Sequence, residues 1–174
     1  MASGVSGSEV RRVAQVRGEG SRGVSEERVV AWLGIRREAV WSERAGEMAG
    51  ERVLEAYRDR GYWNAEIEGR EERETASGLV VVFGVREGGQ TRVGTVGFSG
   101  ELPVPLEQLK AIVDTRKGDP LRRGSLQGDA EALMDLFERI GYPYAAIVPD
   151  VRIAPGASVV NVVWGIDAGP RVSI

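Results

Sequence analysis

The hydrophobic and polar positions follow one succession of patterns twice along the chain. In the second half, alternation over 92–98 predicts a strand, and apolar residues at helical spacing predict helices over 103–113 and 125–140. Ser125 is predicted to cap the second helix, and Met134 to lie on its apolar face. Apolar runs predict two more strands over 144–153 and 159–166. The predicted order is therefore strand, helix, helix, strand, strand.

The first half shows the same order at matching positions. A strand is predicted over 9–17, helices near 25–34 and 42–60, and strands near 63–73 and 78–86. The order of elements is thus repeated in full, which predicts two copies of one structural unit.

Matching residues at a constant offset support this repeat. Gly61-Tyr62 recurs as Gly141-Tyr142, 80 residues later, and the apolar helix positions before it match at the same offset. We therefore predict a disordered start at 1–8, a first domain at 9–89, a second domain at 90–170, and the start of a truncated third repeat at 171–174.

The third strand of each repeat is predicted to lie in the middle of its sheet. Its residues, 79–83 and 159–164, form apolar β-branched runs, which are typical of a central strand. The predicted fold class is α+β. It comprises two tandem β-α-α-β-β domains, each a three-stranded mixed sheet of order 1-3-2 covered by two helices on one face. Trp164, Tyr62 and Tyr142 are predicted to pack in the cores.

The composition excludes most enzyme chemistry. The 174 residues include no cysteine and no histidine, which excludes thiolate and imidazole metal sites, thiol nucleophiles and Ser-His-Asp triads. The formal net charge of −3 argues against the basic face that nucleic-acid binding needs. Carboxylate pairs such as Glu66 and Glu68 are interpreted as charges of a solvated strand edge. We expect no catalytic residue, no metal, no cofactor and no nucleic-acid partner.

Two strings in register resemble the signature of tandem POTRA domains. They are Leu54-x-x-Tyr57-x-x-x-Gly61-Tyr62 with Val85-x-Glu87-Gly88, and Leu133-x-x-x-Phe137-x-x-x-Gly141-Tyr142 with Ile166-x-x-Gly169. POTRA domains are polypeptide-transport-associated modules of outer-membrane assembly and translocation proteins, such as BamA- and TamA-like proteins and two-partner secretion transporters. Ala168 departs from the pattern, because a glutamate is expected before Gly169. The resemblance implies a periplasmic module of a parent protein that a C-terminal barrel, outside this chain, anchors in the outer membrane.

A nucleotide- or RNA-binding α/β domain is the alternative that two loops raise. Gly18 to Gly23 match G-x-G-x-x-G between a strand and a helix, as in dinucleotide-binding loops. The second repeat has no such glycines at the matching turn, and Glu43, the acidic residue at the expected distance, falls on a helix. The linkers 34–37 and 115–118 lack the G-x-x-G clamp of RNA-binding KH domains. A mobile surface turn is therefore favoured at Gly18 to Gly23.

Polypeptide binding at an exposed sheet edge is the function that these patterns favour. An unfolded outer-membrane or secreted polypeptide, or an accessory lipoprotein, would add a strand there through sequence-tolerant main-chain hydrogen bonds. The candidate residues at the two predicted edges are Ala65, Ile67, Ala145, Ala146, Ile147 and Val148. The second edge is favoured because it is apolar and uncharged, and Leu133 and Phe137 are predicted to line a groove beside it. A module of a two-partner secretion transporter and a purely structural spacer arm, jointed at 88–91, stay open as alternatives.

Overall fold

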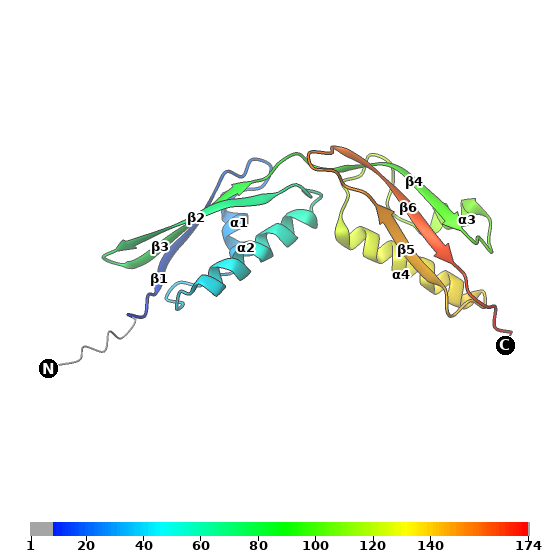
Figure 1. Ribbon diagram of the computed structural model, residues 1–174, viewed down its shortest axis with the longest axis horizontal. Helices are drawn as coiled ribbons and strands as arrows, with labels where there is room; N and C mark the ends of the chain where they lie inside the picture. Colours follow the sequence, from blue (N-terminus) through cyan, green and yellow to red (C-terminus); the bar gives the residue numbers. More distant parts are fainter. Residues whose placement is uncertain (1–8, 174) are drawn as a thin grey trace. The chain divides into compact units, whose positions relative to one another are not determined.

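The computed structural model describes residues 9–173 as ten helices and strands in two successive sets. The first set is β1 (Val13–Glu19), α1 (Glu26–Leu33), α2 (Glu43–Arg58), β2 (Glu66–Thr75) and β3 (Gly78–Arg86). The second set is β4 (Arg92–Gly100), α3 (Leu106–Ile112), α4 (Arg123–Arg139), β5 (Ala146–Val151) and β6 (Val159–Asp167). Both sets have the predicted order of elements (Figure 1). The start predicted at 1–8, and Ile174 of the predicted third repeat, lie outside the described residues.

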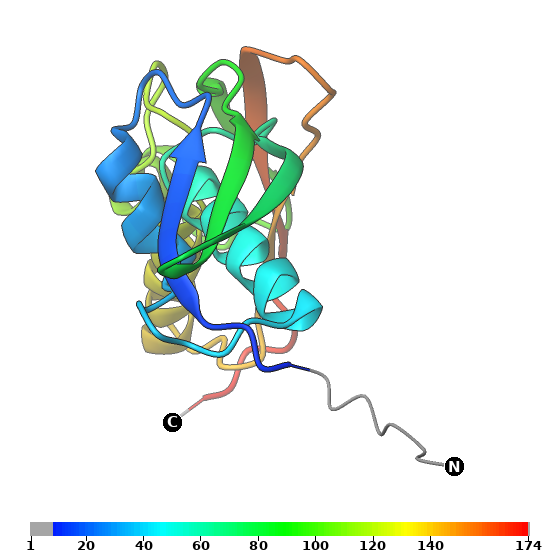
Figure 2. The same cartoon turned by 90° about the vertical axis from the view of Figure 1, so that its left-hand side faces the viewer.

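Each set forms one three-stranded mixed sheet with its last strand in the middle. The strand orders are β1-β3-β2 and β4-β6-β5. The first and last strands of each set run parallel because a two-helix crossover connects the first strand to the hairpin, and the hairpin strands run antiparallel. Figure 2 shows α1 and α2 on one face of the sheet β1-β3-β2. The predicted α+β class and the 1-3-2 order are confirmed.

Alternate side chains of the two central strands form the cores beneath the helices. Successive side chains of a strand point to opposite faces, so one row of each central strand is buried against the helices. On β3 this row is Leu79, Val81, Phe83 and Val85. On β6 it is Val160, Val162, Trp164 and Ile166. The predicted core position of Trp164 is confirmed, since its side chain is 0% exposed.

The two Gly-Tyr tyrosines pack against the helix that precedes each of them. The Tyr62 ring lies edge-to-face with Tyr57, with 5.6 Å between the centroids. The Tyr142 ring lies 6.3 Å from that of Phe137. Tyr57 and Phe137 are fully buried, whereas Tyr62 and Tyr142 are half-buried. The tyrosines therefore extend the cores at their margins rather than occupying their centres.

Two predictions about the long helix α4 are wrong. Ser125 does not cap it, because α4 begins at Arg123 after an N-cap residue, Arg122, that makes no side-chain hydrogen bond to the helix. Met134 is 43% exposed, and Leu136 is buried instead. The buried face is centred on Leu133, and the next residue lies about 100° around the helix axis from it. Met134 therefore points away from the sheet.

A glycine with positive φ ends the first strand of each repeat. The φ angle is 96° at both Gly20 and Gly100, a conformation that strains any residue with a side chain. A Cβ at Gly20 would also collide with the carbonyl oxygen of Val85, and one at Gly100 with that of Ile166. Gly100 is thus the counterpart of Gly20, which corrects the expectation that the second repeat has no such glycine at this turn.

The described chain divides into two compact units. The first contains the residues up to Ala56 together with Ala65–Glu87, and the second contains Tyr57–Asn64 together with the residues from Gly88 onward. The domain limits 9–89 and 90–170 stay a prediction drawn from the repeat.

Candidate functional site

Strand β5 leaves one side of its backbone unpaired at the edge of the second sheet. It pairs with β6 from Ala146, opposite Asp167, to Val151, opposite Val162. No other strand of residues 9–173 pairs with β5. An edge of this kind presents backbone N–H and C=O groups that another extended chain can use. β5 is therefore the first candidate for a polypeptide-binding edge.

The exposed side chains at the start of β5 are apolar and uncharged. Val148 is 63% exposed, and Tyr144, two residues before the strand, is 72% exposed. Ala146 is exposed between them, and Ala145 is half-buried. Ile147 is only 7% exposed, because its side chain joins the core. Of the four residues predicted for this edge, Ala146 and Val148 thus offer side-chain surface, and Ile147 offers backbone.

Pro149 indicates which backbone groups of β5 face outward. Proline has no N–H, so in an edge strand its nitrogen faces away from the neighbouring strand. Backbone groups alternate in direction along an antiparallel strand, so Ile147 and Val151 also direct their N–H and C=O groups outward. The free edge therefore has amide donors at 147 and 151 with a gap between them. Pro149 was not among the predicted edge residues, although a proline inside a strand pattern is itself a signal of an edge strand.

Leu133 and Phe137 do not line an open groove beside β5. Both side chains are 0% exposed and belong to the core cluster that includes Ile147 and Trp164. They are buried because α4 packs against β5 and directs this face inward. They hold the edge from inside and present no surface to a ligand, so the geometry predicted for them is wrong.

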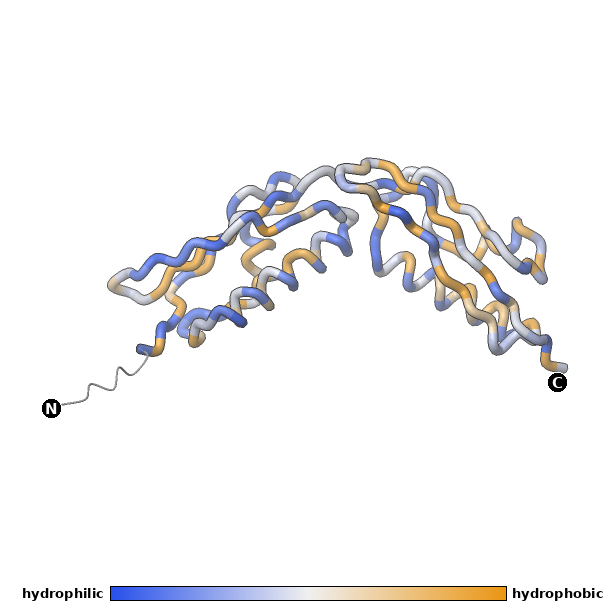
Figure 3. Tube along the Cα trace, in the orientation of Figure 1, coloured by the Kyte–Doolittle hydropathy of each residue, from blue (hydrophilic) through white to orange (hydrophobic). Residues whose placement is uncertain are grey.

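Strand β2, the edge of the first sheet that corresponds to β5, is covered by ion pairs. Arg70 lies 2.6 Å from Glu43, and Arg86 pairs with Glu66. Figure 3 shows β2 as largely hydrophilic. Of the residues predicted for this edge, Ala65 is buried and precedes the strand, and Ile67 is half-buried. Charged side chains along an edge oppose pairing with another chain, so β5 is the more accessible of the two edges.

Glu72 is the centre of this charged surface on β2. Its carboxylate accepts hydrogen bonds from Trp41 Nε1 at 2.9 Å and from Arg11 Nη1 at 2.7 Å. The Arg70 guanidinium lies over the Trp41 ring, 5.2 Å from its centroid. Partial burial acts to raise the pKa of Glu72, but these two hydrogen bonds and the charges of Arg11 and Arg70 outweigh it and lower the pKa below its ordinary value. The cluster stabilises the charged carboxylate and is not poised for proton transfer.

Comparison with known families identifies the second domain. The family POTRA, described as surface antigen variable number repeat, matches residues 91–169. That domain is a POTRA domain. The POTRA fold covers the rest of the chain as well. The crystal structure of POTRA domains 3–5 of BamA from Haemophilus influenzae aligns with 95% of this chain and 69% of its own, with a TM-score of 0.66 and 18% identity.

Two curated relatives, both named outer membrane protein assembly factor BamA, are similar to part of the chain. The protein from Neorickettsia risticii is 31% identical over 101 residues, which are 56% of this chain and 13% of that protein. The protein from Nitratidesulfovibrio vulgaris is 29% identical over 118 residues, which are 66% of this chain and 15% of that protein. The chain therefore spans about one seventh of the length of these relatives. The family, relatives and fold together support POTRA domains of a BamA-like protein.

The glutamate that precedes the last glycine of the POTRA signature has a structural role in the first domain. Glu87 is 7% exposed and accepts hydrogen bonds from the backbone N–H of Gly23 at 2.7 Å and of Arg22 at 3.3 Å. These amides belong to the loop that matches the dinucleotide pattern, so a protein carboxylate holds donors that a phosphate would need. Ala168, at the equivalent position of the second POTRA domain, is buried and has no carboxylate to offer.

The part of the chain from residue 9 to residue 173 has neither a metal-binding cluster nor a membrane-spanning helix. No group of three or more acidic side chains is close enough there to hold a metal ion. None of its helices is both long and apolar enough to cross a bilayer.

Proposed function

We propose that the chain is a periplasmic polypeptide-binding module of an outer-membrane β-barrel assembly protein. It binds unfolded outer-membrane or secreted polypeptides, or partner lipoproteins, by adding an extended segment to the free edge of β5. The observation that carries this proposal is the edge itself, which is unpaired on its outer side among residues 9–173 and has Val148 63% exposed. The names of the two curated relatives, which are assembly factors, support this cellular setting.

Backbone hydrogen bonds supply most of the affinity in this mechanism. The outward amides of Ile147 and Val151 each contribute about 0.5–1.5 kcal/mol when an added strand accepts from them. Main-chain pairing is indifferent to side-chain identity, so one edge serves many clients. Tyr144, Ala146 and Val148 add apolar contacts at alternate positions of the client. The missing donor at Pro149 interrupts the ladder, which opposes indiscriminate pairing between sheets.

The test measures binding of a fluorescently labelled, unfolded outer-membrane protein segment to the chain by anisotropy. Ile147→Pro and Val151→Pro each remove one outward amide and leave the pairing with β6 intact. We expect binding about three- to ten-fold weaker for each. Val151→Pro is included because Ile147 is 7% exposed, and loss of its core packing destabilises the domain. Circular dichroism checks that both variants are folded.

A pair of exposed valines gives a matched control. Val148 and Val159 are 63% and 60% exposed, but Val159 begins the central strand β6. A lysine on an edge strand opposes the addition of another strand, so Val148→Lys is expected to weaken binding and Val159→Lys to leave it unchanged. Undiminished binding by the folded proline variants would overturn the proposal. A chain that binds no unfolded segment at all would favour the spacer arm.

A further inference from the structure

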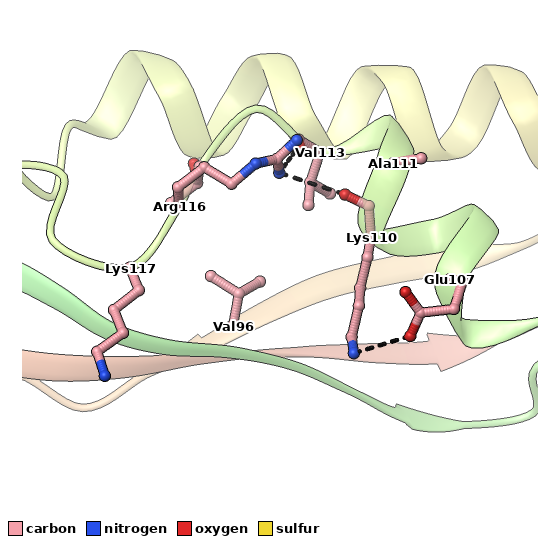
Figure 4. Close-up of a pocket in the computed structure, with 8 residues that line it drawn as sticks. Val96, Glu107, Lys110, Ala111, Val113, Arg116 and Lys117 are labelled. Atoms are coloured by element: carbon pink, nitrogen blue, oxygen red, sulfur yellow. Dashed lines mark hydrogen bonds and ion pairs between the residues drawn. The ribbon is translucent and has the colours of Figure 1, made fainter.

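A pocket separates α3 from β4 in the second domain (Figure 4). Its volume is about 420 Å³, which is within the range of ligand sites. The floor and walls are Val96 of β4, the α3 residues Glu107, Lys110 and Ala111, and residues 113 and 115–117 of the following segment. The pocket lies at the β4 edge of the second sheet. This is the edge opposite β5, since β4 and β5 are the two outer strands of that sheet.

The two repeats differ at the position of this pocket. In the first domain α1 packs against β1, and Gly18 permits this approach, because a Cβ there would lie 2.7 Å from Cγ1 of Val29. Phe98 takes the place of Gly18 in the second repeat, and α3 has at most sparse contact with β4. Phe98 packs against the core cluster that contains Leu109 of α3, and its ring needs volume in a close-packed interior that the hydrogen atom of Gly18 does not.

The only two lysines of the chain, Lys110 and Lys117, line this pocket. Figure 4 shows them on either side of Val96. Lys110 Nζ lies 3.1 Å from Glu107 Oε1, and Lys117 forms no ion pair in the described part of the chain. Arg116 is already engaged, because its Nη1 donates to the carbonyl oxygens of Lys110, at 3.2 Å, and Val113. Two ammonium groups, one of them paired with Glu107, therefore flank an apolar floor in a chain whose net charge is −3.

The pocket lies beside a second free strand edge. Arg92 bridges to Pro120, and Val93 exchanges backbone hydrogen bonds with Gly118 and Asp119. Beyond Val93, no strand of residues 9–173 pairs with the outer side of β4. The unpaired stretch of β4 beyond Val93 includes Val96, which lines the pocket together with the two lysines.

We propose that this pocket binds an acidic side chain of an extended polypeptide that lies along β4. The carboxylate sits between Lys110 and Lys117, and neighbouring aliphatic groups contact Val96 and Ala111. A polypeptide is the occupant because three features lie together. The open strand edge matches a peptide backbone, the apolar floor matches aliphatic groups, and the two lysines match a carboxylate. The inference rests on the proposed polypeptide-binding function and adds to it a selectivity for negative charge that the apolar start of the β5 edge lacks.

The test uses two peptides of alternating valine and threonine that differ only at the centre, glutamate in one and glutamine in the other. Nuclear magnetic resonance titrations of the chain monitor the amides of Val96 and Ala111 on one side and of Ile147 and Val151 on the other. We expect the glutamate peptide to bind at the pocket about two- to five-fold more tightly per lysine contact, a preference that falls with added salt. The double variant Lys110→Met with Lys117→Met is expected to bind both peptides equally.

The control is a double variant that removes the same charge elsewhere, Arg37→Met with Arg44→Met. Arg37 is the counterpart of Lys117 in the first repeat, and both arginines are exposed on the first domain, outside the sheet that contains β4 and β5. We expect it to retain the preference for glutamate.

A preference that survives the lysine changes, or that disappears equally in the control, would overturn this inference and leave the β5 proposal standing. Binding of neither peptide at either edge would overturn both. Lysine-dependent binding to vesicles of phosphatidylcholine and phosphatidylglycerol, without any preference between the peptides, would assign the pocket to a lipid surface instead and also overturn it.

Discussion

The indole nitrogen of Trp41 donates to the carboxylate of Glu72 at 2.9 Å, which ties the segment before α2 to the edge strand β2. Trp41 is 6% exposed, and the Arg70 guanidinium lies over its ring. The bond therefore links a buried aromatic side chain to the ion pairs that cover β2. This hydrogen bond stabilises the ion pairs on β2. Charged side chains along the strand oppose the addition of another chain to this edge.

Stability is expected to depend on the charge of Glu72. The pKa of Glu72 in the folded chain lies below its ordinary value of 4.5. Its contribution is therefore present above that value and is lost as the pH falls from 4.5 through the lowered folded pKa. Glu72→Gln is expected to cost about 1 kcal/mol at neutral pH and progressively less in that acidic window. Urea unfolding at a series of pH values measures this, with the exposed Glu71→Gln as control. An equal cost of Glu72→Gln at every pH would contradict it.

Alanine at either strand-end glycine is expected to destabilise its domain strongly. Gly20→Ala and Gly100→Ala place a side chain at a φ of 96°, against the carbonyl oxygens of Val85 and Ile166. We expect a loss of about 2–4 kcal/mol in each case, from strain and collision together. Gly128→Ala is the matched control, because this glycine lies inside α4 with nothing within 4 Å of the added Cβ. It is expected to stabilise by up to about 1 kcal/mol. Thermal unfolding compares the three, and a neutral effect at Gly20 or Gly100 would show that the turn relaxes.

Loss of the Asp129 carboxylate is expected to destabilise the second domain. This side chain is 3% exposed and accepts hydrogen bonds from the backbone N–H of Asp114 at 2.6 Å and of Thr115 at 3.1 Å. Asp129→Ala leaves two amides without their acceptor and is expected to cost about 2–3 kcal/mol in unfolding free energy. Asp129→Asn keeps one oxygen acceptor and is expected to cost less. Hydrogen exchange at Asp114 and Thr115 checks the cause, since both amides should exchange faster in the alanine variant. Unchanged exchange would place the effect elsewhere.

Replacement of Thr115 by valine is expected to stabilise the same domain. Thr115 is 4% exposed, and its hydroxyl has no hydrogen-bond partner in the described structure. A buried hydroxyl without a partner costs about 1–3 kcal/mol of desolvation. Thr115→Val removes this cost and keeps both shape and backbone amide, so we expect a gain of about 1 kcal/mol by urea unfolding. Ile35, which is apolar, occupies the equivalent position of the first repeat. A loss of stability would show that the hydroxyl is hydrated.

Local patterns were sufficient for most of the fold. Helical spacing in α2 and α4, and the apolar runs of β3 and β6, predict their elements because each element buries one continuous face or row. Local patterns were insufficient where the role of a side chain depends on contacts with residues that are distant in the sequence. Leu133 and Phe137 follow the same periodicity whether they line a groove or fill a core, and only the packing of α4 on β5 separates these outcomes. Glu87 likewise shows no local sign that it holds the amides of Arg22 and Gly23, more than 60 residues away.

The sequence alone determined the repeat, the order of elements, the central strands and the absence of cysteine and histidine. Residue identity shows the last of these, the constant offset of 80 residues shows the repeat, and local periods within each element show the rest. The tertiary structure decided the rest. It left β5 open and covered β2 with ion pairs. It holds the chain after the first helix of each domain by different means, with Arg52 Nε donating to the Leu33 carbonyl oxygen at 3.2 Å in one and Asp129 accepting from the Asp114 amide at 2.6 Å in the other. It also left a pocket between α3 and β4 in the second domain. These features depend on distances between elements, and such distances are set only when the side chains of both repeats are packed.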